Sequence, residues 1–210
     1  MKLTIQHTVL FDTIKSTSYS MSKQEERSNL NSMLFDSMLF DFNNEQAKIV
    51  ATDGNTLVLN TINNTDYYNL ENNNDVIFLL NRADVNHLII FLKNNFHKKM
   101  DLQVVNIEIV GITITFELNG NKAIYNLMSA DTFPNYKRVI PLHKYDTLPN
   151  NVLLNADYLA NCGKIFEKCK SVEFLLNTPS EALSMAPVSI KSSHTLFNID
   201  ILYVIMPIRK

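Results

Sequence analysis

The 210-residue chain has little of several residue types that mark particular classes of protein. It contains two cysteines, four glycines, six prolines and no tryptophan. So few glycines and prolines exclude collagen-like and linker-like chains. The 46% of hydrophobic and 19% of charged residues indicate an ordinary folded protein. The length suits one large domain or two small ones.

The chain also lacks a strong charge of one sign and a long hydrophobic run. Its formal net charge is −2, so no overall basic field points to a nucleic-acid partner, and any contact with DNA would need a local stripe of charge. The longest apolar run, residues 88–92, is far shorter than the ~20 residues that span a bilayer. The N-terminus has no apolar signal core. We therefore expect a cytoplasmic protein with no membrane partner.

Patterns for catalysis and metal binding are missing as well. Cys162 and Cys169 are seven residues apart, which is not a CxxC spacing and favours small buried side chains on one helix face. The five histidines are far apart and none has metal-ligand spacing. There is no GxGxxG, phosphate-binding loop or GxSxG. The sequence predicts no metal, no cofactor and no catalytic residue, and therefore not an enzyme.

What the chain does contain is one pattern repeated three times at a spacing of roughly 70 residues: a short strand, an amphipathic helix and several strands. The first copy is predicted as strand 3–5, helix 7–20 and strands 33–42, 48–51 and 56–60, followed by a surface connector at 61–74. The second is strand 75–80, a helix and strands 102–105, 106–109, 112–118 and 122–127. The third is strand 152–154, a helix and strands 172–176, 188–190, 195–198 and 203–206. Such a chain predicts an α+β fold with helices on one face of antiparallel sheets.

The helix starts carry recognisable caps. Asn81 is predicted to cap the second helix, with an apolar face that includes Val85, Leu88 and Leu92. Asn155 is predicted to cap the third.

The apolar face of the third helix is predicted to be Leu159, Cys162, Phe166 and Cys169. Its polar face would include two lysines, which are considered below as DNA contacts.

A tandem duplication interrupts the first copy, because residues 32–36 and 37–41 both read SMLFD. Five is an odd number, so an unbroken strand would present opposite faces in the two copies. We expect a bulge or an extruded loop at this point.

Three local sequences, taken in order, resemble one family. They are YSMSKQEERSNLNSMLF at 19–35 with VATDGNTL at 50–57, FPNYKRVIP at 133–141, and YVIMPIR at 203–209. Their order and spacing are similar to those of the bacterial DNA polymerase III beta subunit, the DNA sliding clamp. The chain resembles a short, divergent member that lacks the N-terminal domain and half of the C-terminal domain. Residues 1–141 resemble the middle clamp domain, and 142–210 resemble the second half of the C-terminal domain.

The resemblance implies a DNA-clamp fold and a function in DNA replication as a processivity factor. Such a clamp slides on double-stranded DNA and tethers DNA polymerase and other clamp-binding proteins, which carry short linear motifs. It also implies a homo-oligomer, a clamp loader as a candidate partner, and a cytoplasmic, nucleoid-associated location.

The resemblance further implies a peptide-binding pocket between the middle and C-terminal domains. An apolar cleft with a few polar groups suits a motif with aliphatic and aromatic anchors. By alignment of the motifs, the pocket wall is expected to comprise Leu30, Thr52, Gly54, Asn55, Thr56, Leu57, Pro134, Arg138, Val139, Val204, Met206, Pro207, Ile208 and Arg209. At Asn55 and Thr56 the family commonly has His and Arg, so two chargeable groups are missing from the pocket edge here.

For DNA, the resemblance implies diffuse phosphate contacts from inner helices and from a loop after the first helix. The candidates are Lys15, Lys23, Gln24, Arg27, Arg82, Lys93, Lys98, Lys99, Lys164 and Lys168. The pair Lys164 and Lys168 is the strongest, because it lies opposite the predicted apolar face of its helix.

Two alternatives to a DNA-encircling clamp stay open. One is a non-encircling, clamp-like module that keeps the pocket and sequesters or regulates clamp-binding partners. The other is a remnant without a selected function. Three repeats per chain could reach the twelve of a clamp dimer if four chains assembled and half-domains of neighbouring chains paired.

Overall fold

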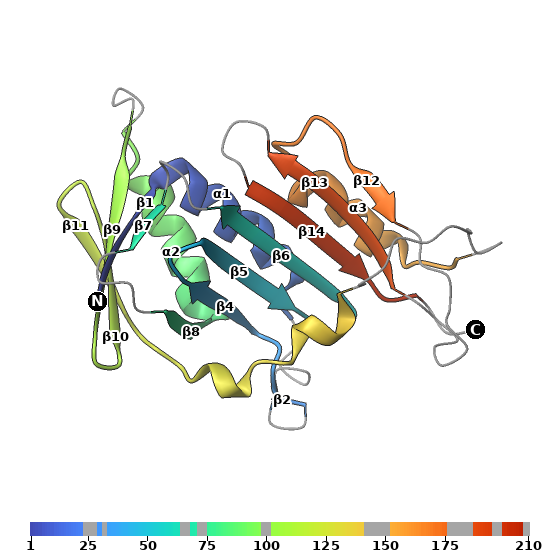
Figure 1. Cartoon of the computed structure of the whole chain (residues 1–210), viewed down its shortest axis with the longest axis horizontal. Helices are drawn as coiled ribbons and strands as arrows, with labels where there is room; N and C mark the ends of the chain where they lie inside the picture. The colour runs from blue at the N-terminus through green and yellow to red at the C-terminus, as the bar shows by residue number, and fades with distance from the viewer. Residues whose placement is uncertain are drawn as a thin grey trace.

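The computed structural model describes residues 1–22, 29–30, 33–63, 68–70, 75–97, 102–140, 152–175, 187–194 and 199–207. Within these ranges the chain forms three α-helices and two large antiparallel sheets (Figure 1). The three helices lie on the same side of the larger sheet. The predicted α+β class is therefore confirmed.

Three strand–helix–strands units follow one another along the chain. The first unit consists of β1 (Lys2–Gln6), α1 (His7–Thr17), β4 (Ser37–Phe42), β5 (Gln46–Thr52) and β6 (Thr56–Asn63). The second consists of β8 (Val76–Asn81), α2 (Arg82–Asn94), β9 (Val104–Val110), β10 (Thr113–Leu118) and β11 (Asn121–Asn126). The third consists of α3 (Ala156–Ile165), β12 (Glu173–Leu175), β13 (Val188–His194) and β14 (Ile199–Ile205).

The first two units exchange their first strands. β1 pairs with β9 of the second unit, and β8 pairs with β4 of the first. The resulting sheets have the strand orders β11-β10-β9-β1-β7, where β7 is Tyr68–Leu70, and β12-β13-β14-β6-β5-β4-β8. The third unit joins the larger sheet because β14 pairs with β6 along seven residue pairs.

The main core lies between the sheets and the helices. α1 packs against β5 and β6 of the larger sheet and also against β9, while α2 packs against β4, β8 and β11. Leu10, Ile14, Leu88 and Leu92 are fully buried at helical spacing on these two helices. Exchange of the first strands therefore makes the first two units one packed body.

The SMLFD duplication interrupts the strand, as expected. Met33–Leu34 of the first copy forms β3, which pairs in a small hairpin with β2 (Asn29–Leu30), whereas the second copy enters the larger sheet as β4. A bend at Phe35 and Asp36 separates the copies. The bend lets the second copy place Phe40 and Phe42 in the core without fixing which way the side chains of the first copy face.

The predictions for three stretches of the chain were wrong. The stretch 61–74 is not only a connector, because β6 continues to Asn63 and β7 adds an edge strand beside β1. Residues 102–109 do not form two strands, because β9 is one strand paired on both sides. Residues 152–154 are not a strand. The predicted strand at 195–198 lies outside the described residues.

None of the described helices is long and apolar enough to cross a membrane.

Candidate functional site: an apolar pocket beside the β6–β14 junction

The face of the larger sheet opposite the helices is partly covered by the segment that follows β11. This segment runs from residue 127 to 140 and includes the 3-10 turns Ala130–Thr132 and Tyr136–Val139 (yellow in Figure 1). Met128 forms a bridge with Leu79, which anchors the segment to β8. Beneath the segment is a second hydrophobic cluster that consists of Leu39, Val50, Leu57, Leu79, Phe133, Tyr136 and Val204.

A cavity of about 200 Å³ opens where this covering segment meets the ends of β5, β6 and β14. We call it the junction pocket. Its walls are formed by Phe35, Thr52, Gly54, Asn55, Thr56, Leu57, Pro134, Asn135, Tyr136, Val139, Val204 and Met206. None of these twelve described side chains is charged, so the pocket suits apolar groups accompanied by a few hydrogen bonds.

The β5–β6 turn holds the polar edge of the pocket in a fixed shape. The Asp53 carboxylate accepts hydrogen bonds from the backbone N–H of Asn55 at 2.9 Å and of Thr56 at 2.6 Å. The Thr52 hydroxyl donates to the Thr56 carbonyl at 2.7 Å and accepts from the Gly54 N–H at 3.1 Å. Asp53-Gly54, a dipeptide typical of tight turns, therefore also shapes the pocket rim.

Gly54 allows a close approach at this turn. Its φ is +84°, and a Cβ there would lie 3.3 Å from Cε1 of Phe35. The ring of Phe35, at the bend in the SMLFD duplication, can therefore form one wall of the pocket. A side chain at position 54 would be strained by its backbone conformation and would press on this ring.

The opposite wall depends on the third unit. Val204 is paired with Leu57 in the β6–β14 ladder, and the Met206 N–H donates to the Asn55 carbonyl at 2.9 Å. Leu57 and Val204 are almost fully buried, whereas Met206 is half-buried. The pocket thus exists only because residues about 150 positions apart in the sequence meet at the junction of two units.

Tyr136 is the one titratable side chain on the pocket wall among the described residues. Burial raises the pKa of its phenol, and the charge of Asp41 raises it further. The phenol therefore stays neutral, and the wall that it forms is uncharged.

The structure gathers nine of the predicted pocket residues around this cavity: Thr52, Gly54, Asn55, Thr56, Leu57, Pro134, Val139, Val204 and Met206. Arg138 is exposed and Pro207 is half-buried, and neither lines the cavity. The side chain of Leu30 and the whole of Ile208 and Arg209 lie outside what the structure describes.

Sequence reasoning missed Phe35, Asn135 and Tyr136 as pocket residues. All three lie inside the motifs that carried the family resemblance, so the signal for them was present. The glycine of the Asp53-Gly54 turn also indicated that a bulky group approaches the backbone there.

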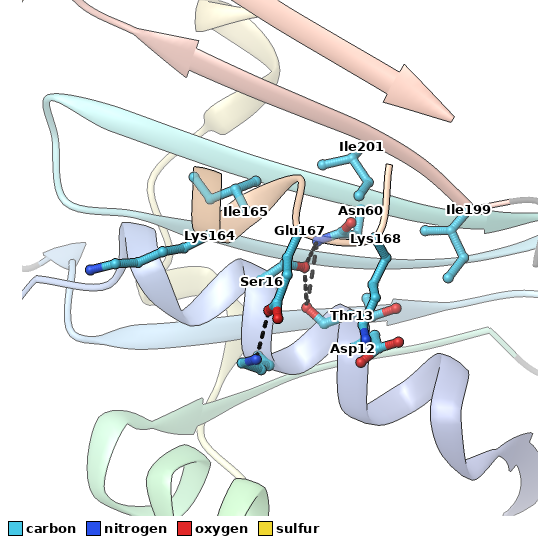
Figure 2. Close-up of a pocket in the computed structure, with 11 residues that line it drawn as sticks. Asp12, Thr13, Ser16, Asn60, Lys164, Ile165, Glu167, Lys168, Ile199 and Ile201 are labelled. Atoms are coloured by element: carbon cyan, nitrogen blue, oxygen red, sulfur yellow. Dashed lines mark hydrogen bonds and ion pairs between the residues drawn. The ribbon is translucent and has the colours of Figure 1, made fainter. Parts of the chain in front are cut away.

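The helix side of the molecule carries the candidate DNA contacts. Lys15, Lys164 and Lys168 border a small, water-sized cleft between α1 and α3 (Figure 2). Lys15 donates a 2.8 Å hydrogen bond to Glu167, which raises the pKa of Lys15 and lowers that of Glu167. Both side chains are substantially exposed, so this ion pair contributes little to stability.

Carboxylates at the same cleft reduce its positive charge. Asp12 and Glu167 border it together with the three lysines, which leaves a formal charge of one positive unit. Lys164 lies over the ring of Tyr19, with its ammonium nitrogen 5.5 Å from the ring centre. Lys164 and Lys168 are both exposed, but Lys168 lies beyond α3, which ends at Ile165, so the two lysines do not share one helix face as predicted.

Below the cleft, Asn60 is fully buried and joins the larger sheet to α1. Its amide nitrogen donates to the hydroxyls of Thr17 at 2.7 Å and Ser16 at 3.1 Å (Figure 2 shows Asn60 with Ser16). Among the described residues its amide oxygen has no hydrogen-bond partner. The cleft holds about 20 Å³, which suits one water molecule on that oxygen.

The remaining DNA candidates are scattered or undescribed. Arg82 donates to the Ser22 carbonyl at 3.2 Å, and Lys93 is exposed in the last turn of α2. Lys23, Gln24, Arg27, Lys98 and Lys99 lie outside the described residues. Within the part that the structure describes, no group of His, Cys, Asp and Glu side chains could hold a metal ion.

No family model and no curated protein matches the sequence. Solved structures match it over its whole length. The DNA polymerase III subunit beta of Pseudomonas aeruginosa superposes with a TM-score of 0.73 at 17% identity, and the match covers 67% of that chain. The beta subunit of Thermotoga maritima gives a TM-score of 0.73 at 15% identity over 66% of that chain. A P. aeruginosa sliding clamp bound to griselimycin gives 0.74 at 17% identity over 66%.

The fold is therefore that of a DNA clamp, with repeated strand–helix–strands units and helices on one side of antiparallel sheets. The structures that it matches are DNA polymerase III beta subunits, the sliding clamps. The resemblance inferred from the three motifs is confirmed at the level of the fold. The chain spans about two thirds of the length of these clamps.

Proposed function

We propose that this protein is a sliding-clamp-like tethering factor in DNA replication. It binds short linear motifs of DNA polymerase and other clamp-binding proteins in the junction pocket, and it slides on duplex DNA as a homo-oligomer. Residues 1–141 serve as a complete clamp domain and 142–210 as a half-domain. The proposal assigns no catalytic step to the chain.

The observation that carries this proposal is the junction pocket itself. Its wall comes from four places in the sequence, at positions 35, 52–57, 134–139 and 204–206, which meet in one uncharged cavity of about 200 Å³. The volume is too small for a folded partner and fits one or two side chains of a linear motif. Half-buried Met206 and Val139 leave adaptable apolar surface at the mouth, which suits partners of different sequence.

Titration with griselimycin tests the pocket, since one matched clamp was solved with this ligand. We expect binding to the full chain and a loss of about tenfold or more in Met206→Asp, because a carboxylate would be desolvated against an apolar wall. Ile112→Asp is the matched control, since Ile112 is 75% exposed at the β9–β10 turn of the smaller sheet. Undetectable binding by the unchanged protein, or equal binding by the two variants, would contradict the proposal.

The helix side supports the DNA-tethering part. Lys164 and Lys168 are exposed there, and phosphate attraction needs no base-specific contact. We expect the protein to remain on a closed circular plasmid at a salt concentration that abolishes ordinary electrostatic binding, and to be released when the plasmid is linearised. Release that is independent of linearisation would instead favour a non-encircling module that only sequesters clamp-binding partners.

A specific observation keeps that module as the second candidate. Within the described residues, β12 pairs only with β13, so one edge of the larger sheet is open. A chain that never covers this edge could bind peptides in the junction pocket and still be unable to enclose DNA.

A further inference from the structure

The third unit contacts the first unit through the β6–β14 ladder, but among the described residues no unit exchanges first strands with it. In the first two units, the strand after the helix pairs with the first strand of the other unit: β4 with β8, and β9 with β1. The equivalent strand of the third unit is β12, and its corresponding edge has no neighbour in the described structure.

The first-strand position of the third unit is also unpaired. Residues 152–154 read Val-Leu-Leu and precede the cap Asn155 just as β1 and β8 precede Gln6 and Asn81. They have an apolar sequence suited to a buried strand, yet Leu153 is 48% exposed and the segment pairs with nothing in the described ranges.

The helix position four residues after each cap shows the same difference. Leu10 in α1 and Val85 in α2 are fully buried, whereas Leu159 in α3 is 38% exposed. Ala156, Ala160 and Gly163 continue this exposed stripe along α3, and Lys164, four residues after Ala160, borders it. Small side chains at this spacing would allow another helix to approach closely.

The inner face of β12 is exposed too. Phe174 is paired with Ile190, which is paired with Tyr203, so its side chain lies on the core face of the sheet. Ile190 and Tyr203 are fully buried, but Phe174 is 53% exposed. The corresponding strands of the first two units bury their core-facing residues, for example Phe40, which stacks on Phe78 of the exchanged strand with ring centres 4.9 Å apart.

We propose that the third unit binds the third unit of a second copy of this chain. Residues 152–154 of each copy add antiparallel to β12 of the other, and the two α3 helices pack side by side as α1 and α2 do. The occupant is a second copy because the missing complement is one strand–helix–strands unit, and a twofold axis supplies both exchanged strands at once. This inference extends the proposed clamp function, since it specifies the contact through which the homo-oligomer forms.

The interface would cover the exposed apolar side chains at this end of the molecule: Leu153, Leu159, Val172 and Phe174. It would also satisfy the unpaired backbone of β12, because an open strand edge attracts another strand. Two copies joined in this way contain six units, the same number as three clamp domains of two units each.

The solution mass of the full chain tests this contact. We expect a multiple of two chains by light scattering, and a fall to half that mass or less in Phe174→Glu. Ile90→Glu is the matched control, because Ile90 is 55% exposed on α2 and lies outside the proposed interface. Its mass should equal that of the unchanged protein.

A second variant guards against a folding defect in the first. A Cβ at Gly163 would meet no atom within 4 Å and Gly163 is exposed, so we expect a single copy to tolerate Gly163→Trp, whereas the indole would block the approach of a second α3. Circular dichroism should show unchanged helix content in both variants. A monomeric unchanged protein, or two interface variants that keep its mass, would overturn the inference.

The test separates this inference from the proposed function. Griselimycin binding uses the junction pocket at the β6–β14 pairing, so Phe174→Glu should retain it while losing the partner copy. Retained griselimycin binding by a protein that is monomeric without any substitution would overturn the dimer contact alone. Loss of griselimycin binding with an intact dimer would overturn the pocket alone.

Discussion

The first two units and the third unit have nearly the same sequence pattern but different surroundings. Each has an apolar strand position, a helix and an antiparallel meander, and the side chains of Asn81 and Asn155 each accept a hydrogen bond from a backbone N–H in the first turn of the helix. In the first two units the first strand is buried through exchange. In the third unit the same position is left half-exposed and unpaired within the described residues.

This difference shows that burial in a repeat protein is a property of unit pairs. An isolated strand–helix–strands unit has a hydrophobic face on its sheet and on its helix, and it cannot cover both alone. The third unit buries part of its apolar surface against β6 and α1. Apolar side chains on its outer side stay exposed in the described structure.

The largest expected effect is the difference between the losses of stability in Phe40→Ala and in Phe174→Ala. Phe40→Ala should lower the free energy of unfolding by about 3–5 kcal/mol, because it removes a fully buried ring that stacks on Phe78. Phe174→Ala should change the stability of a dilute, monomeric protein by no more than about 0.5 kcal/mol. Urea unfolding measures both.

Unfolding measured at several protein concentrations tests the same difference between Phe40 and Phe174. If a second copy covers Phe174, the loss in Phe174→Ala should increase with protein concentration, whereas the loss in Phe40→Ala should not. If the loss in Phe174→Ala stays the same at every protein concentration, no second copy covers Phe174.

A smaller effect is expected at the helix caps. The side chains of Asn81 and Asn155 accept 2.8 Å hydrogen bonds from the backbone N–H of Asp84 and Asp157. Asn81→Ala and Asn155→Ala should each lower stability by about 1 kcal/mol. Gln6→Ala is the control, because Gln6 precedes α1 without a side-chain capping bond. A loss at Gln6 as large as at the asparagines would contradict this assignment.

The smallest effect is a pH dependence at the contact between the first two units. His7 begins α1, is buried, and its Nε2 lies 3.0 Å from the Leu92 carbonyl of α2. Burial lowers the pKa of His7 below its ordinary value of 6.5, and a protonated ring is therefore favoured in the unfolded chain. Stability should fall as the pH drops below about 6.5, because the unfolded state then binds more protons.

His7→Gln tests this pH effect by removing the titrating ring while keeping a side-chain donor. Unfolding curves at pH 7.5 and pH 5.5 should differ less for the variant than for the unchanged protein. The same difference for both proteins would show that His7 is not responsible. The third unit has Ala156 at the equivalent position, so it lacks this contribution.

Local patterns in the sequence identified most of the fold. Apolar positions at helical spacing located α1, α2 and α3. Asn119-Gly120, a dipeptide typical of tight hairpin turns, lies between β10 and β11, where both residues have positive φ. The odd length of the SMLFD repeat located the break between β3 and β4. Each of these features depends on residues that are close together in the sequence, so it can be recognised from the sequence alone.

The sequence could not show which strands pair. It predicted 152–154 as a strand from its apolar residues, but a strand forms only where a partner edge accepts its backbone hydrogen bonds. It likewise predicted Leu159 on the buried face of α3, although 38% of that side chain is exposed. Both errors have the same cause. The pattern of apolar residues shows that a segment is suited to burial, but the segment is buried only where another strand or helix packs against it.

The amino-acid sequence by itself determined the three repeated units, their helix caps and turns, and the motifs that resemble a sliding clamp. Only the tertiary structure decided that β6 and β14 lie side by side, because pairing between residues about 140 apart depends on how whole units pack. That pairing brings Leu57 and Val204 together and so creates the junction pocket. Among the described strands it also leaves β12 at the end of the sheet, which is the physical reason that a second copy is proposed to complete the third unit.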